Sequence, residues 1–293
     1  METSLSEMSP MEGLEDVPIH QFTGIPSLRK LVDSQSDRLQ KRDSNQQYCV
    51  VQNVTEEDLA KIDSKRASIG KHTRMSHYAD TDLLIIKLMP SAEHEEAHLL
   101  LGQYFFARLT TMGIPPGGII PLGSTKFLGR RSSKEGDSAY KPRSRNKKTD
   151  WPTIVFESGL SESLSRLRSD AHWWLTHSGG EVKTVVIISI RLAQRDIRVE
   201  KWILAPPTGR RRTLRANANA NAPVPTKVQQ IAITPAPATP PNPTQGQYVV
   251  TGTPLVLEFD QIFLRPPVAP EGDVIFTATD LSAWAADFWN TLE

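Results

Sequence analysis

The sequence has little cysteine, no long apolar run and almost no net charge. Cys49 is the only cysteine in 293 residues, which excludes an intrachain disulfide framework and a cysteine-rich zinc site. Lysine and arginine number 34 against 33 aspartates and glutamates, which excludes a uniformly basic nucleic-acid-binding surface. The longest apolar run, within 185–190, is too short for a membrane span. Since the acidic N-terminus also lacks the apolar core of a secretory signal, we expect an intracellular protein of the nucleus or cytoplasm, without a membrane partner.

Two segments have the composition of disordered chain. Residues 1–24 contain no lysine or arginine, and we expect the whole region 1–48 to be acidic and largely disordered, apart from a short helix near Pro26. Residues 205–247 contain nine prolines and no aromatic residue, which predicts a disordered insertion rich in Pro, Ala and Asn. The remaining segments, 49–204 and 248–293, are expected to form one core, the second supplying a strand and a helix.

The core region alternates helical and strand-like patterns. Apolar residues at helical spacing predict helices over 91–112 and 161–176. Nearly continuous apolar runs predict buried strands over 153–157 and 182–190. Helices and strands in this mixed order predict an α/β or α+β layered fold.

Two carboxylates stand at the ends of predicted strands. Asp137 begins a short strand, and Glu157 ends the buried strand over 153–157. A carboxylate there is costly unless it meets a cation or hydrogen-bond donors. Two such groups can share a hard divalent cation, which polarises a phosphodiester and activates water. The alternatives are that Glu157 caps a helix or pairs with an arginine, and that Asp137 begins a turn.

These motifs resemble a known nuclease superfamily. The segments GDSAYKP at 136–142 and WPTIVFESGLS at 151–161 resemble the Asp hairpin and Glu-bearing strand of restriction-endonuclease-like, PD-(D/E)xK nucleases. The longer pattern E-x-G-x-S-E-S-L followed by L-R-x-D-A-x-W-W-L is similar to a fungal branch of such proteins. The resemblance covers about 91–203 and implies a restriction-endonuclease-like α/β (α+β) core, with a mixed central sheet flanked by helices.

The resemblance also implies a ligand set. Asp137, Glu157 and the Ser158 carbonyl would hold Mg²⁺ or Mn²⁺, and Glu95 or Glu96 of the first core helix would add an outer carboxylate. No separate organic cofactor is implied.

One position departs from the family pattern. The family has a lysine two residues after the glutamate, where this chain has Gly159. Arg168 in the following helix, or Lys141, could supply the positive charge instead. Arginine can stabilise a developing phosphate charge but stays protonated, so it cannot serve as a general base. The departure therefore leaves open whether the site is catalytic.

A basic stretch surrounds the proposed carboxylates. Residues 126–148 contain nine lysines and arginines against only Glu135 and Asp137. Such a stretch could track a phosphate backbone through counterion release, or it could be an ordinary solvated loop.

A competing motif is His94-Glu-Glu-Ala-His98, a literal H-E-x-x-H on a predicted helix. Histidines at i and i+4 can bind zinc, with Glu95 as general base. Leu99 follows directly and no third ligand is evident nearby, which favours a polar helix start over a zinc peptidase.

The leading hypothesis is thus a metal-dependent DNA phosphodiesterase, an endonuclease-like enzyme derived from a mobile element. Asp137, Glu157 and either Arg168 or Lys141 would be its catalytic residues, and DNA would be its partner. By analogy with restriction-type enzymes, which often dimerise to cut both strands, a homodimer is possible. The alternative from another class is a catalytically inactive binding or scaffold protein on the same fold. Metal-dependent cleavage that is lost on substitution of the carboxylates would distinguish them.

Overall fold

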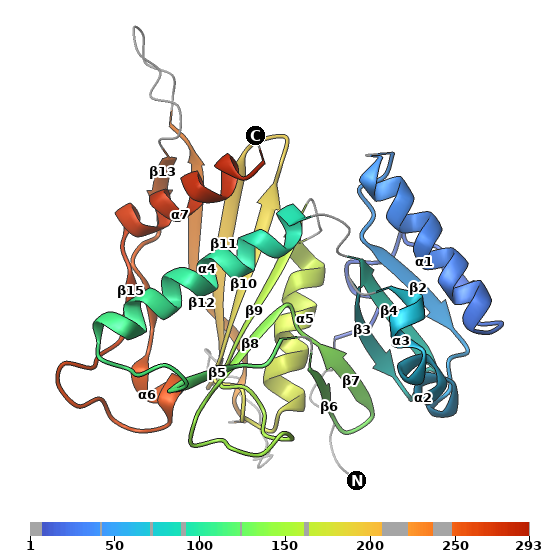
Figure 1. The fold of residues 1–293 in the computed structure, drawn as a ribbon, viewed down its shortest axis with the longest axis horizontal. Helices are drawn as coiled ribbons and strands as arrows, with labels where there is room; N and C mark the ends of the chain where they lie inside the picture. Colours follow the sequence, from blue (N-terminus) through green and yellow to red (C-terminus); the bar gives the residue numbers. More distant parts are fainter. Residues whose placement is uncertain are drawn as a thin grey trace, which may run out of the picture.

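The computed structural model shows a mixed α+β architecture with two large sheets and flanking helices (Figure 1). It describes residues 8–41, 43–70, 73–88, 92–123, 125–160, 164–206, 222–236 and 248–292. None of the helices in this described part has the length and hydrophobicity of a membrane span.

Sheet A is the smaller of the two large sheets and holds the N-terminal strands. Only β1 and β2 pair in parallel, and the other pairs are antiparallel. In spatial order its strands are β1 (Ile19–Gln21), β2 (Tyr48–Gln52), β4 (Leu83–Leu88), β3 (Thr73–Tyr78), β7 (Ser132–Glu135) and β6 (Lys126–Leu128).

Sheet B contains the segments that the sequence predicts as the core. Its one parallel pair is β9 with β10, joined by a helical crossover, while its other pairs are antiparallel. In spatial order its strands are β13 (Tyr248–Thr251), β12 (Val224–Pro235), β11 (Asp196–Ala205), β10 (Thr184–Arg191), β9 (Ile154–Leu160), β8 (Ser138–Pro142) and β5 (Ile119–Pro121). A third, two-stranded sheet joins β14 (Leu255–Leu257) to β15 (Val274–Phe276).

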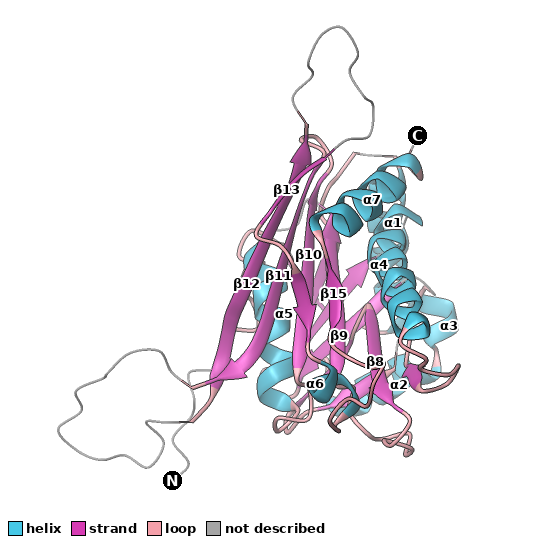
Figure 2. Cartoon of the chain, turned by 90° about the vertical axis from the view of Figure 1, so that its left-hand side faces the viewer, coloured by secondary structure: helices cyan, strands magenta, loops and turns pink. Residues whose placement is uncertain are grey.

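Helices cover both faces of sheet B. Helices α4 (Ala92–Thr111) and α7 (Ala278–Asn290) lie on one face, and α5 (Leu164–His177) lies on the opposite face (Figure 2). The short α6 (Phe259–Phe263) joins the α4 and α7 side. Helix α4 buries apolar side chains four residues apart, from Ala97 to Leu109, and this spacing is why its sequence folds as one amphipathic helix.

Three further helices pack on sheet A. Helix α1 (Ile25–Gln40) buries Leu28 and Val32, while α2 (Glu56–Ser64) and the single turn α3 (Arg66–Ile69) bury Ile62 and Ile69. Thr55 is the N-cap of α2, because its hydroxyl accepts a hydrogen bond from the Asp58 amide at 3.2 Å.

Both predictions of extended disorder need correction. Within 1–48 the chain forms β1 and the 16-residue α1, and Leu14 and Val17 are buried against sheet A. Within 205–247, residues 224–235 form the 12-residue strand β12. The composition of this segment does not indicate a strand. Residues 224–235 form one because their backbone pairs with β11 on one side and with β13 on the other. Residues 207–221 and 237–247 lie outside the described residues.

The chain passes from sheet A to sheet B through α4, between β4 and β5, and again at a short link after β7. Strand β7 ends at Glu135, Gly136 and Asp137 follow, and β8 begins at Ser138 in the other sheet. A Cβ on Gly136 would lie 3.0 Å from the Trp174 ring, so glycine lets the link pass close to α5 without displacing that ring. This link places Asp137 between the two sheets.

Candidate functional site

A cluster of buried charged side chains lies where the two sheets meet. We call it the junction cluster; its six members come from β4, β7, the link, β9 and α5, and all are at most 5% exposed. They are Lys87, Lys134, Asp137, Glu157, Arg166 and Asp170. The structure therefore brings Asp137 and Glu157 together, as the order of the predicted strands suggests.

Asp137 is held from both sheets. Its Oδ2 accepts hydrogen bonds from Lys87 Nζ at 2.9 Å and from the Ser158 amide at 2.8 Å, with the Ser158 hydroxyl at 3.3 Å. Lys87 Nζ also donates to the Ser158 carbonyl oxygen at 2.5 Å. The ammonium thus bridges the carboxylate at the start of β8 and a backbone carbonyl of β9.

Glu157 is buried on the α5 side of β9. Its Oε1 accepts a hydrogen bond from Trp174 Nε1 at 2.6 Å, and Lys134 Nζ lies 3.9 Å away. Burial raises the pKa of Glu157 to about 8, and the nearby charge of Asp137 adds to the effect, while Lys134 opposes it. Burial therefore disfavours the charged form of this carboxyl group.

The rest of the cluster is an ion-pair network around Asp170. Its Oδ1 lies 2.7 Å from both Lys134 Nζ and Arg166 Nη2. Burial opposes the charged form of Asp170, but Arg166 and Lys134 outweigh it and lower its pKa. Arg166 Nη1 also donates to the carbonyl oxygen of Pro10 at 2.7 Å, so the N-terminal segment closes the cluster over α5.

The predicted divalent metal does not fit this donor set. Of the ligands that the resemblance assigns to it, the Ser158 carbonyl and one carboxylate oxygen of Asp137, Oδ2, bind the Lys87 ammonium instead. Oε1 of Glu157 is occupied by the hydrogen bond from Trp174 Nε1. Across the described residues, no three His, Cys, Asp or Glu side chains form a group that could hold a metal ion.

The two candidate replacements for the missing lysine have other partners. Arg168 makes a two-pronged ion pair with Glu200 of β11, at 3.0 and 2.6 Å. Lys141 is buried and donates to the carbonyl oxygen of Lys147 at 2.6 Å. In this conformation neither is hydrogen-bonded to the carboxylates of Asp137 or Glu157, and their catalytic roles stay predictions.

The H-E-x-x-H residues lie at the first turns of α4, as expected. His98 is buried and its Nδ1 is 2.7 Å from the Ser138 hydroxyl, while Glu95 pairs with Arg74 at 3.5 Å. The side chain of His94 lies outside the described residues. Glu96 is half-buried, with a buried Oε2 that has no hydrogen-bond partner in the described part of the chain.

Sequence reasoning missed Lys87. The signal was present, because it is the one charged residue in the strand Leu-Leu-Ile-Ile-Lys-Leu, in which every position is buried. A lysine in such a strand costs free energy unless an anion receives it. The sequence therefore indicates that Lys87 has an anionic partner. It does not indicate that this partner is Asp137, 50 residues further along the chain.

A groove of about 430 Å³ opens beside the junction cluster. The end of β3, the turn before β7, α5 and residues 8–10 form its walls. Its polar and aromatic lining consists of Ser9, Tyr78, Asp80, Thr81, Arg130, Arg131, Ser132, Ser169, His172, Trp173 and His177. The indole of Trp173 stacks on the His177 ring at 4.9 Å and donates to the Ser132 hydroxyl at 2.9 Å, which fixes one wall.

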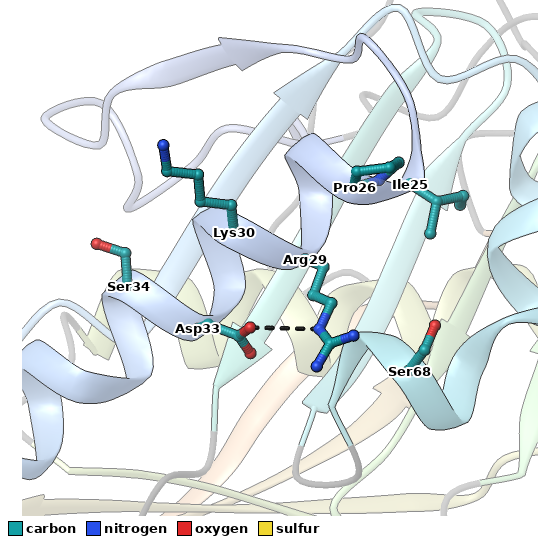
Figure 3. A pocket seen from close by; sticks show the side chains of 7 residues that line it. All are labelled: Ile25, Pro26, Arg29, Lys30, Asp33, Ser34 and Ser68. Atoms are coloured by element: carbon teal, nitrogen blue, oxygen red, sulfur yellow. Dashed lines mark ion pairs between the residues drawn. The ribbon is translucent and has the colours of Figure 1, made fainter.

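A second hollow, of about 480 Å³, lies between α1 and α3, far along the chain from the cluster (Figure 3). Arg29 and Lys30 project there, but Arg29 pairs with Asp33 at 3.4 Å. It contains none of the predicted site residues.

Most of the basic stretch 126–148 is occupied by internal contacts. Lys126 pairs with an aspartate of α2, Lys134 lies in the junction cluster, and Arg145 pairs with Glu181. Arg130 and Arg131 are exposed and line the groove. Arg143, Lys147 and Lys148 are exposed as well. Of the exposed basic residues in this stretch, Arg130 and Arg131 in the turn before β7 are those that line the groove.

Comparison with known proteins adds little. No protein-family model and no curated protein matches the chain. Among solved structures, it is similar to one described as a "putative nuclease belonging to DUF820" from Anabaena variabilis ATCC 29413. The two chains are 12% identical, and the match covers 72% of this chain and 90% of that one with a TM-score of 0.37. Functional argument rests on the cluster and the groove.

Proposed function

We propose that this protein binds nucleic acid through the groove beside α5 and does not cut it. The observation that carries this proposal is the position of Lys87, whose ammonium satisfies Asp137 and the Ser158 carbonyl together. Asp137 and Glu157, which would take part in metal-dependent hydrolysis, are instead buried in the junction cluster and hydrogen-bonded to neighbouring side chains. This is the non-catalytic alternative among the two sequence-based hypotheses.

Burial supports a closed unit. Asp137 is 3% exposed and Glu157 is 1% exposed, so a phosphodiester could reach them only after the two sheets separate. Such a separation would leave Lys87 and Lys134 without their buried anions, which is costly. Hydrolysis also needs a water molecule and a phosphate placed within hydrogen-bond reach of the acting groups.

The groove has the chemistry of a phosphate-binding surface. Arg130 and Arg131 line the groove from the turn before β7, and His172 and His177 line it from α5, together with the single acidic lining residue Asp80. Asp80 pairs with Arg131, so the two arginines and this aspartate together leave one net positive charge on this part of the lining. Arginine presents several N–H groups to phosphate oxygens, and neutralised phosphates release counterions.

The tip of the β6–β7 hairpin adds an apolar contact. Leu128 is 73% exposed at the end of β6, two residues before Arg130. An apolar side chain flanked by arginines is a combination that minor-groove-binding proteins use against base steps. We therefore propose double-stranded DNA as the favoured nucleic acid, with phosphates in the groove and Leu128 against the bases.

A metal-dependent phosphodiesterase is the second candidate. The observation in its favour is that Lys87, with Asp137 and Glu157, restores the residue types of the nuclease motif that Gly159 breaks. In that case Lys87 would leave Asp137 when Mg²⁺ binds and would stabilise charge on the phosphate. A DNA-binding role without cleavage requires no such rearrangement.

The test measures binding and cleavage on the same preparations. Fluorescence anisotropy with labelled single- and double-stranded DNA is compared for wild type, Arg130→Ala/Arg131→Ala and the control Arg143→Ala. Arg143 lies in the same basic stretch, is exposed and does not line the groove. We expect wild-type and control proteins to bind alike and the double variant to bind at least tenfold more weakly.

Cleavage is then followed with Mg²⁺ or Mn²⁺ for wild type, Asp137→Ala and Glu157→Ala. We expect no cleavage above that of the variants. Metal-dependent cutting that both substitutions abolish would establish the second candidate. Absence of DNA binding by the wild type, or equal binding by the groove variant, would refute the proposed binding function.

A further inference from the structure

We propose that Ser9 is a phosphorylation site, and that its phosphate group docks in the groove beside α5 by binding the arginines of the turn before β7. The modification of Ser9 and the docking of its phosphate concern this chain alone. The loss of nucleic-acid binding that follows from them rests on the proposed function.

The sequence around Ser9 and its exposure suit a protein kinase. Ser9 is followed directly by Pro10, and serine before proline is the pattern that proline-directed kinases accept. The residue is exposed, and its hydroxyl accepts a hydrogen bond from the Met11 amide at 3.2 Å. A kinase can therefore reach this hydroxyl without opening the core of the protein.

The chain that follows Ser9 is anchored beside the groove. The carbonyl oxygen of Pro10 accepts a hydrogen bond from Arg166 Nη1 at 2.7 Å. The Glu12 amide donates to the Ser9 carbonyl oxygen at 3.0 Å, and Leu14 is buried against sheet A. Because these contacts already hold position 9 in the lining, a phosphate added there loses little chain entropy when it meets its partners.

The transfer uses ATP and a kinase that act on this chain from outside. The Ser9 hydroxyl oxygen attacks the γ-phosphorus of ATP, and the new O–P bond forms there. The bond between that phosphorus and the bridging oxygen breaks, and ADP leaves with its electron pair. The hydroxyl proton passes to the catalytic aspartate of the kinase. This chain supplies only the acceptor hydroxyl.

The groove presents the partners that a phosphate group needs. Ser9 lines it together with Arg130 and Arg131. Arginine donates paired N–H groups to phosphate oxygens, and such charge-assisted hydrogen bonds are strong. The groove has a volume of about 430 Å³, and each water that a phosphate displaces takes about 30 Å³, so the group has room without moving the walls.

Phosphorylation reverses the charge of this lining. Arg130, Arg131 and the acidic lining residue Asp80 together leave one net positive charge when the lining histidines are counted as neutral. A phosphoserine adds a charge of about −1.5 to −2 at pH 7, so the lining becomes net negative. A phosphate of nucleic acid then meets an occupied groove and a like charge. Modification of Ser9 therefore switches off binding at this groove.

The first experiment tests the modification. Wild type and Ser9→Ala are incubated with ATP and, in separate reactions, with a cyclin-dependent and a mitogen-activated protein kinase, which both accept serine before proline. Intact mass and peptide mapping should show one more phosphoryl group on wild type than on Ser9→Ala, located at position 9. Equal phosphorylation of the two proteins by both kinases, or none, would overturn the assignment of Ser9 as a modification site.

The second experiment tests docking without nucleic acid. Phosphoserine is incorporated at position 9 of wild type, of Arg130→Ala/Arg131→Ala and of the control Arg143→Ala, which is exposed and does not line the groove. The phosphate should raise the melting temperature of wild type and control by about 2 °C or more and that of the double variant by clearly less.

Phosphorus NMR titration of the same three phosphoproteins reports the contact itself. The second pKa of the phosphate group should be lower in wild type and control than in the double variant, because nearby arginines favour the dianion. Phosphate pKa values and melting temperatures that do not depend on Arg130 and Arg131 would overturn the docking.

The third experiment links the phosphate to nucleic-acid binding by anisotropy with double-stranded DNA. Phosphorylated wild type should bind about tenfold more weakly than unmodified wild type, or weaker still, while Ser9→Ala should bind alike before and after kinase treatment. Equal binding by the two forms of wild type would refute the switch. If unmodified wild type binds no DNA, the proposed function fails, and the melting and NMR results still decide whether the phosphate docks.

Discussion

The Lys87 ammonium and the Asp137 carboxylate meet across the boundary between the two large sheets, 2.9 Å apart. Lys87 belongs to β4, an inner strand of sheet A, and Asp137 immediately precedes β8 of sheet B. Their pairing, with the contact of Lys87 to the Ser158 carbonyl, fixes how the two sheets lie against each other. An ion pair in this position specifies geometry, because few other arrangements satisfy both buried charges.

The first prediction is strong coupling between these two residues. Lys87→Met and Asp137→Leu should each lower the free energy of unfolding by about 3–5 kcal/mol, since each leaves one buried charge without its partner. The double variant should lose much less than the sum of the two. Urea unfolding of all four proteins gives the coupling energy directly. Additive effects would mean that the pair is broken in solution.

The second prediction concerns pH and Glu157. Its pKa is about 8 in the folded protein because of burial, against an ordinary value of 4.5 in the unfolded chain. Between these values the folded state holds the proton more tightly, so the stability from this group is complete below about pH 4.5 and is lost as the pH rises toward 8. Glu157→Gln removes this loss while keeping an amide oxygen for Trp174.

The measurement is urea unfolding of wild type and Glu157→Gln from pH 5 to pH 8. The variant should gain stability relative to wild type as the pH rises, by at most about 1.4 kcal/mol per pH unit. The shift belongs to the coupled group that includes Lys134 and Asp137, so the gain can be spread over the whole interval. A difference that stays constant with pH would show that Glu157 is ionised in the folded state.

Local patterns in the sequence predict much of this fold. The apolar stripe of 91–112 forms α4, because apolar residues at helical spacing bury one face of a helix. The apolar run of 182–190 forms β10, because a nearly continuous apolar run is typical of a strand buried on both faces. The approach of Asp137 to Glu157 was also foreseeable, since β8 and β9 are adjacent antiparallel strands. Glu157 lies in the middle of β9 and not, as the sequence predicts, at its end, because the strand continues to Leu160. It is the antiparallel register, Ser138 opposite Phe156, that sets it beside Asp137.

Contacts between distant segments could not be predicted in the same way. Lys87 and Asp137 belong to different sheets, and nothing in their local sequences states how those sheets pack. Strand β12 was read as disorder because its pairing with β11 and β13, not its composition, makes it a strand. Arg168 shares a helix with the cluster residues Arg166 and Asp170, yet it points to Glu200 instead.

The third prediction concerns the salt dependence of DNA binding. If Arg130 contacts a phosphate, Arg130→Ala should lower the slope of log K against log salt by about 0.9 for duplex DNA. For Arg131→Ala the measured change also includes the loss of its pair with Asp80. Anisotropy titrations between about 50 and 200 mM salt measure these slopes. An unchanged slope in Arg130→Ala would place the phosphates elsewhere on the protein.

The fourth prediction assigns Arg168 a structural role. The Glu200 side chain is fully buried, and Arg168 binds both of its oxygens, with Lys227 at 3.5 Å. Burial by itself would raise the pKa of Glu200, but the hydrogen bonds and charge of Arg168 outweigh it and hold the pKa below the ordinary 4.5. The stability from this pair is therefore present above pH 4.5 and is lost as the pH falls below it. Arg168→Ala should cost about 2 kcal/mol at pH 7 and clearly less near pH 3.5.

Arg168→Lys separates charge from geometry in the same experiment. A lysine keeps the positive charge but cannot bind both oxygens of Glu200, so its loss of stability should be intermediate. All three proteins should bind DNA equally well, because Arg168 does not line the groove. If Arg168→Ala instead left stability unchanged at pH 7 and abolished a metal-dependent cleavage, Arg168 would be part of a catalytic site, because a purely structural arginine would show the opposite result.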